Sequence, residues 1–133
     1  MKILGDVYQN ICNSVSDTPP ETGGILGGSN NVVTEYSLDN GVESGSQCSY
    51  TPNVEKLNKV IAEWQNQRIE FMGIYHTHYF GVSTLSDADK QYILAIMQAM
   101  PDYVKELYFP LVVMPQREMI VYKATYIKER LTI

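Results

Sequence analysis

The chain has 133 residues, of which 44% are hydrophobic and 19% are charged, and its formal net charge is −5. This length suits one domain spanning residues 1–133 with a packed core, which excludes a disordered or fibrous protein, and the acidic balance argues against nucleic-acid binding. No stretch is long enough to span a membrane, Asp6 comes too early for a signal peptide, and Cys12 and Cys48 lack a paired spacing, so we expect a cytoplasmic protein with reduced thiols.

The first half of the chain combines a helix with a hairpin. Apolar residues from Ile3 to Val15 recur at helical spacing, and the prolines at 19–20 end that helix. The glycine-rich stretch that follows predicts a strand in which the backbone approaches its neighbours closely. In chain order we predict a strand over 22–28, a turn over 29–31, a second strand over 32–38 and a surface loop over 39–49.

The second half alternates helices with apolar strands. Thr51 and Pro52 are typical of a helix start, and residues 69–78 are apolar on both faces, as in a central strand covered on each side. In chain order we predict a helix from 52 to about 67, a strand over 69–78, a helix from Ser86 to about Met100, and strands over 109–114 and 119–125 around a turn at 115–118; residues 126–133 fit either a strand or a short helix. These elements predict an α/β or α+β fold, a single three-layer domain with a mixed β-sheet flanked by helices.

Both histidines of the chain, His76 and His78, lie at the end of the strand predicted over 69–78. Side chains two apart in a strand point to the same face, so both imidazoles can be directed at one point. A carboxylate would complete a set of two histidines and one acid, which leaves a coordination position for water. Zinc suits these ligands, although non-haem iron also takes two histidines and one carboxylate. We therefore predict a catalytic metal centre.

Two acids, Asp87 and Asp89, follow in the first turn of the next predicted helix, and their spacing alone does not choose the metal ligand. Ser86 and Asp89 fit a capping box, and Asp87 has an ordinary role in stabilising the start of the helix. Ser86 has two candidate roles. One is to cap the helix, and the other is to donate a hydrogen bond to an oxyanion near the metal, an effect of about 10²-fold or more on rate.

Glu21 lies between the prolines at 19–20 and the glycine-rich strand. Hydrolysis at a metal needs a group that moves a proton from water to the leaving amine, and Glu21 is our candidate for this general base. Without the histidine motif, a glutamate at such a junction would be interpreted as an ordinary solvated residue. Cys48 is not expected to act as a nucleophile, because no free histidine remains to activate it.

These candidate residues resemble the JAMM (MPN-plus, JAB) motif of zinc metallopeptidases in order and in spacing. The motif here consists of Glu21, then His76-x-His78, seven residues, Ser86, two residues and Asp89. The similarity continues in further segments, at 21–27, 52, 73–75 and 109–113. The resemblance implies a cytidine-deaminase-like JAB/MPN fold. It also implies one Zn²⁺ per chain held by His76, His78 and Asp89, with Glu21 as the general base and Ser86 polarising the tetrahedral intermediate.

The chain departs from the motif at two positions. Thr77 replaces the usual serine, which should have a mild effect, and Tyr79 stands where a proline usually follows the second histidine. The second change could redirect the loop at 79–85, where substrate is expected. The chain also lacks the long insertions that bind ubiquitin in eukaryotic deubiquitinases, so it resembles a compact bacterial-type member of the family.

The resemblance implies a zinc-dependent peptidase or isopeptidase that cleaves after the C-terminal Gly-Gly of a ubiquitin-like or sulfur-carrier protein. We expect a protein or peptide substrate and neither a nucleic acid nor a membrane as partner. An exposed strand edge, with the loops at 39–49 and 79–85, would hold an extended tail. Two alternatives are a non-catalytic scaffold module that binds proteins and an iron-dependent oxidation enzyme. The intact motif favours the peptidase.

Overall fold

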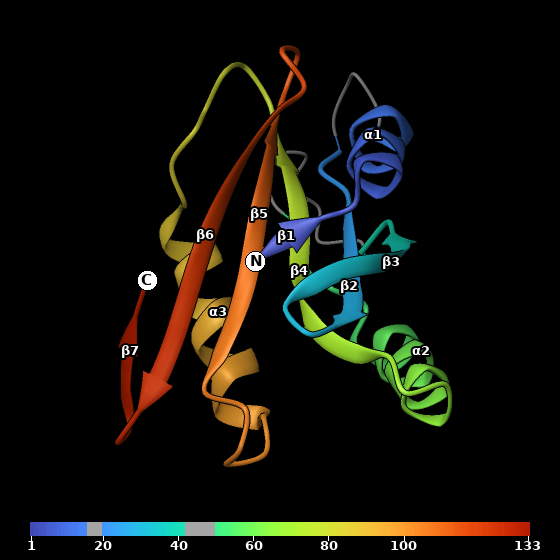
Figure 1. Cartoon of the computed structure of the whole chain (residues 1–133). Helices are drawn as coiled ribbons and strands as arrows, with labels where there is room; N and C mark the ends of the chain where they lie inside the picture. Colours follow the sequence, from blue (N-terminus) through green and yellow to red (C-terminus); the bar gives the residue numbers. More distant parts are fainter. Residues whose placement is uncertain (16–19, 42–49) are drawn as a thin grey trace.

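The computed structural model describes residues 1–15, 20–41 and 50–133, which form a seven-stranded mixed sheet flanked by helices (Figure 1). In chain order the elements are β1 (Lys2–Ile3), α1 (Gly5–Ser14), β2 (Gly23–Ser29), β3 (Val32–Asp39), α2 (Val54–Asn66), β4 (Glu70–His78), α3 (Asp87–Ala99), β5 (Glu106–Val113), β6 (Glu118–Ile127) and β7 (Arg130–Thr132). The strand order is β1-β3-β2-β4-β5-β6-β7. The pairs β1/β3 and β4/β5 are parallel, and the other pairs are antiparallel.

Two apolar layers hold the helices on opposite faces of the sheet. Helix α1 packs against one face through Val7, Ile11 and Val15. Helices α2 and α3 pack against the other face, and α3 lies behind β5 and β6 in Figure 1. The predicted fold, a mixed sheet between helices, is therefore confirmed. Within the part of the chain that the structure describes, no helix has both the length and the apolar character needed to cross a membrane.

The elements follow the predicted order, with differences at their ends. Ile3 pairs with Val33 in β1 and so lies outside the helix in which we had placed it. Strand β5 begins at Glu106, three residues before the predicted start, and the undecided tail forms the end of β6 and the short strand β7. The predicted helix end at 16–19 and most of the predicted loop, 42–49, lie outside the described residues.

The central strand β4 contains a β-bulge. The register between β2 and β4 shifts between Leu26 and Gly27, and Met72 is left without a partner in β2. Beside the bulge, Gly73 lies against β5 so closely that an added Cβ would be 1.7 Å from the carbonyl oxygen of Tyr108. The position therefore requires glycine, and an isolated glycine within a strand is itself a sequence signal for a bulge.

The bulge decides which face the histidines occupy. Phe71 and Ile74, three residues apart on either side of the bulge, both pack on the face of α2 and α3. An uninterrupted strand would place them on opposite faces. Since the alternation resumes after Ile74, His76 and His78 lie on the same face as α3, whose first turn carries Asp89.

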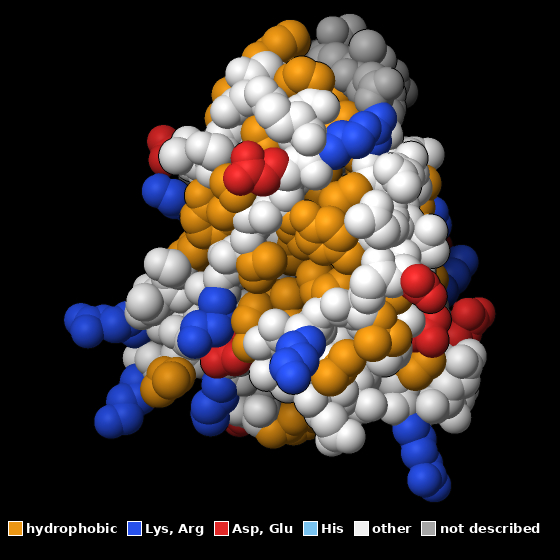
Figure 2. Space-filling view, turned by 45° about the horizontal axis from the view of Figure 1, so that its top comes forward, with side chains coloured by type: hydrophobic (Ala, Val, Ile, Leu, Met, Phe, Trp, Pro, Cys, Tyr) orange, Lys and Arg blue, Asp and Glu red, His pale blue; other side chains and the backbone are white. Residues whose placement is uncertain are grey.

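The face that carries α1 is only partly covered. Hydrophobic side chains gather in a hollow in the middle of that face (Figure 2). On its β6 side, Val121 and Ile127 are 44% and 50% exposed. These positions alternate with Tyr122 and Tyr126, which pack with α3 on the other face.

Candidate metal centre

Three buried side chains converge where β4 ends and α3 begins. His76 Nε2 lies 3.1 Å from His78 Nε2, and His78 Nε2 lies 2.9 Å from Asp89 Oδ2. The third separation, between His76 Nε2 and Asp89 Oδ1, is 3.3 Å. All three residues are at most 5% exposed. The strand alternation expected from the sequence thus brings both imidazoles to one point, and an acid joins them.

The structure separates the two candidate acids. Asp89 is buried and contacts both histidines, whereas Asp87 is exposed at the first position of α3. Asp89 is held by the capping box. Its backbone N–H donates to Ser86 Oγ at 3.1 Å, and its Oδ2 accepts from the backbone N–H of Ser86 at 2.9 Å. The first turn of the helix therefore fixes the carboxylate against the histidines.

Ser86 is compatible with both of its candidate roles. Its hydroxyl oxygen accepts the capping hydrogen bond, as predicted. A hydroxyl that accepts one hydrogen bond still carries a proton that it can donate. Because Ser86 is exposed beside the buried Asp89, that proton is accessible to a molecule bound at the site.

Glu21 joins the cluster from the segment before β2. Ligand atoms of Glu21, His76 and His78 lie within 4.8 Å of one another, so this group could hold a metal ion. Glu21 is only 6% exposed, and its Oε1 is buried with no hydrogen-bond partner among the described residues. It is therefore not the solvated side chain that its position alone would suggest, and an unpartnered buried carboxyl oxygen is typical of a functional site.

Thr77 and Tyr79, the two departures from the motif, both contact the segment around Glu21. Thr22 N donates to Thr77 Oγ1 at 3.0 Å, and Thr77 N donates to the carbonyl of Thr22 at 2.8 Å. Thr77 thus retains the hydroxyl of the usual serine and joins β4 to the residue after Glu21. Tyr79 is buried with the core on the α1 face, and its hydroxyl donates to the carbonyl of Pro20 at 3.4 Å.

The two carboxyl groups have opposite pKa shifts. Burial raises the pKa of Glu21 to about 7. Burial also acts to raise the pKa of Asp89, but hydrogen bonds with His76 and His78 outweigh it and hold this pKa well below its ordinary value. Burial lowers the pKa of His76. It acts in the same direction on His78, but the hydrogen bond with Asp89 leaves that pKa raised. Two acids with divergent environments are typical of sites in which they have different roles.

The raised pKa of Glu21 predicts that the metal-free protein becomes less stable against unfolding as the pH rises. Its folded-state pKa of about 7 exceeds the ordinary value of 4.5, so the folded state binds the proton more tightly. The stabilisation that this tighter proton binding gives the folded state is complete below pH 4.5 and is lost as the pH rises through 7. Metal-free Glu21→Gln should thus be more stable than the wild type by up to about 3 kcal/mol at pH 8 and by less than about 1 kcal/mol at pH 5. Chemical denaturation at both pH values measures this, with the exposed Glu35→Gln as the control; a pH-independent difference would contradict it.

Sequence reasoning missed two tyrosines that contact His76. Tyr92, on α3, has its hydroxyl 3.0 Å from His76 Nδ1. Tyr50 is stacked on the ring of His76, with centroids 5.9 Å apart and planes 12° apart. Tyr92 lies three residues after Asp89, which places both side chains on one side of the helix, and this spacing was the available signal.

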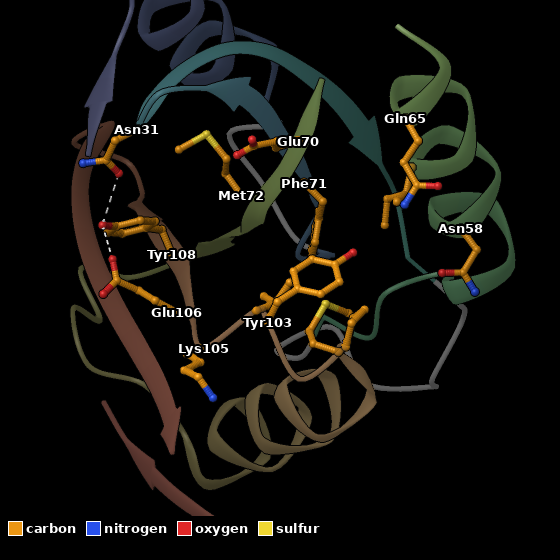
Figure 3. A pocket seen from close by; sticks show the side chains of 14 residues that line it. Asn31, Asn58, Gln65, Glu70, Phe71, Met72, Tyr103, Lys105, Glu106 and Tyr108 are labelled. Carbon is orange, nitrogen blue, oxygen red and sulfur yellow. Dashed lines mark hydrogen bonds between the residues drawn. The ribbon is translucent and has the colours of Figure 1, made fainter. Parts of the chain in front are cut away.

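A hollow lies at the opposite end of the sheet. It has a volume of about 680 Å³ and is lined by residues around the starts of β4 and β5, among them Phe71, Met72 and Tyr103 (Figure 3). At its edge the Tyr108 hydroxyl donates to Glu106 at 2.6 Å. None of the predicted site residues lines this hollow, so it is separate from the candidate metal centre.

Comparisons with known proteins agree with the observed fold. Residues 7–123 match the family described as prokaryotic homologs of the JAB domain. No curated protein matches the chain. The solution structure of protein DSY2949 from Desulfitobacterium hafniense is similar with a TM-score of 0.70 at 14% identity, over 98% of this chain and 87% of that one. The crystal structure of AF2198, a JAB1/MPN domain protein from Archaeoglobus fulgidus, is similar with a TM-score of 0.56 at 19% identity, over 92% and 88% of the two chains.

Proposed function

From the premise that this chain belongs to the family of prokaryotic homologues of the JAB domain, we propose that it is a zinc-dependent metallopeptidase that hydrolyses a peptide or isopeptide bond. One observation carries the proposal. The buried imidazole nitrogens of His76 and His78 lie 3.1 Å apart and each lies 2.9–3.3 Å from a different carboxylate oxygen of Asp89, while a carboxyl oxygen of Glu21 groups with both histidines.

These separations support zinc as the metal. Bonds of about 2.0–2.1 Å at tetrahedral angles separate the ligand atoms of a zinc ion by about 3.3 Å. The separation of 3.1 Å between the two imidazole nitrogens, and those of 3.3 Å from His76 to Asp89 Oδ1 and 2.9 Å from His78 to Asp89 Oδ2, are close to this value. Three protein ligands leave the fourth position open, as in catalytic zinc sites. Asp89 lies within 3.3 Å of both imidazoles and is held there by the capping box, whereas Oε1 of Glu21 has no hydrogen-bond partner among the described residues, which favours Asp89 as the ligand and Glu21 as the base.

In this proposal Glu21 carries the proton. A bound zinc ion would polarise the scissile carbonyl and lower the pKa of water from about 15.7 to about 7. Glu21 accepts a proton from the attacking water and delivers it to the nitrogen of the leaving amine as the carbon–nitrogen bond breaks. The Ser86 hydroxyl donates to the developing oxyanion while its oxygen continues to cap α3.

We propose a ubiquitin-like or sulfur-carrier protein with a C-terminal Gly-Gly as the substrate class, which rests on the family resemblance. The segment after His78 supports a protein partner. Phe80 is 79% exposed and Val82 is 48% exposed, so apolar surface adjoins the site. Phe80 also has a φ of +59°, a backbone conformation unfavourable for a bulky residue, and such conformations cluster at functional sites.

The proposal predicts metal-dependent cleavage. Zinc-loaded protein should release the fluorophore from peptides that end in Gly-Gly joined to an aminocoumarin, or cleave a lysine isopeptide with the same tail. A chelator should abolish the release, and added Zn²⁺ should restore it. Zinc-loaded protein that cleaves neither class of substrate, or cleavage that persists after chelation, would contradict the proposal.

A further inference from the structure

We propose that Tyr92 and Tyr50 are positioning residues that hold His76 in the orientation and tautomer needed to bind a metal, an inference that rests on the proposed zinc site. His76 is fully buried, with an exposed fraction of 0%. Its imidazole has contacts on three sides: the ligand cluster at Nε2, the Tyr92 hydroxyl at Nδ1 and the Tyr50 ring on one face.

Tyr92 fixes the tautomer of His76. When Nε2 provides its lone pair to a metal, the neutral ring carries its proton on Nδ1. That N–H can then donate to the Tyr92 hydroxyl oxygen, 3.0 Å away. A partner on the second ring nitrogen is the usual device by which proteins orient a metal-binding histidine.

Tyr50 fixes the plane of the ring. Its own ring is nearly parallel to that of His76, and its hydroxyl donates to Asp39 Oδ2 at 2.9 Å. The same oxygen of Asp39, at the end of β3, accepts from the backbone N–H of Asn53, the N-cap of α2, at 2.9 Å. Tyr50 is thereby anchored to two elements and cannot turn away from His76 without breaking a buried hydrogen bond.

Strand β2 provides the space for this stacked ring. A Cβ added to Gly23 would lie 2.8 Å from Cζ of Tyr50 and 2.3 Å from the carbonyl oxygen of Tyr75. Gly23 is paired with His76 across the β2–β4 ladder. The glycine therefore lets the Tyr50 ring reach the imidazole, which explains physically why the strand after Glu21 begins with glycine.

The test compares Tyr92→Phe and Tyr50→Phe, which keep the rings and remove only the hydroxyls, with the wild type. Tyr122→Phe is the matched control, because its hydroxyl donates to the carbonyl of Ser83 at 2.7 Å and its ring packs in the same apolar layer. The readouts are the Zn²⁺ dissociation constant, from competition with a chromophoric chelator, and the absorption spectrum of bound Co²⁺. Thermal unfolding of the metal-free proteins identifies any general loss of structure.

We expect Tyr92→Phe to weaken Zn²⁺ binding about 10- to 100-fold and to alter the Co²⁺ spectrum, with an unfolding temperature close to that of the control. Tyr50→Phe should weaken binding in the same direction by less, because the stacked ring remains. Wild-type affinity and spectrum in Tyr92→Phe would overturn the inference and leave the proposed function intact. A wild-type protein that binds neither metal would overturn both.

Discussion

Replacing Glu21 with glutamine is expected to slow hydrolysis by the zinc-loaded protein about 10²- to 10⁴-fold, the usual contribution of a general base. Glutamine has nearly the same shape but does not accept a proton at neutral pH. The carboxyl of Glu21 is buried and lies close to both histidines. Among the described residues, Asp89 is the one other acid placed beside both histidines, and it is the proposed ligand. The measurement is kcat/KM on the Gly-Gly aminocoumarin peptide.

The zinc content of the same variant distinguishes two roles for Glu21. As a base, Glu21 can be replaced while His76, His78 and Asp89 keep the metal, so Glu21→Gln should contain as much zinc as the wild type. As a ligand, which the 4.8 Å grouping with both histidines also allows, it would lose zinc and activity together. Glu35→Gln, on the exposed surface of β3, should match the wild type in both measurements. Full activity in Glu21→Gln would refute the base role.

The second large effect is expected at Asp89. Asp89→Asn should weaken zinc binding strongly, because the carboxylate itself contacts both imidazoles. The loss should exceed the roughly 10- to 100-fold effect that is typical of residues which only hold a ligand in place. Asparagine retains an oxygen that can accept from the backbone N–H of Ser86. The start of α3 should therefore persist, and the variant should lose affinity for zinc and keep its fold. Chelator competition measures it.

Asp87 offers a matched control in the same helical turn. Asp87→Asn removes the same charge two residues away, but Asp87 is exposed and contacts neither histidine in the described structure. Its removal should leave zinc affinity near the wild-type value and cost a few tenths of a kcal/mol through the start of the helix. An equal loss of affinity in both variants would point to the general negative charge of the turn and against Asp89 as a ligand.

Much of the site could be predicted because it depends on local geometry. His76 and His78 face one direction since strand residues alternate, and Ser86 caps α3 since serine at that position accepts from the helix start. The choice between Asp87 and Asp89 could not be made from spacing. Only the packing of α3 against β4 shows which carboxylate is turned toward the histidines.

Other features depend on contacts between distant segments, which local patterns indicate only weakly. Tyr50 reaches His76 from beyond β3, and Tyr92 reaches it from α3. Strand β1 has only two residues and forms by pairing with β3, so its second residue, Ile3, fitted the helical spacing equally well. The bulge at Met72 had one sequence signal, the neighbouring Gly73, because β4 is apolar on both faces and shows no alternation that a shift could disturb.

Elemental analysis of the purified, zinc-reconstituted protein beside His76→Ala tests the central claim most directly. The account predicts about one zinc ion per wild-type chain and a loss of that zinc in the variant, since His76 is a proposed ligand whose Nε2 lies 3.1 Å from His78 Nε2 and 3.3 Å from Asp89 Oδ1. No zinc in either protein, even after reconstitution, would contradict the metal centre and leave a non-catalytic scaffold as the better description of this chain.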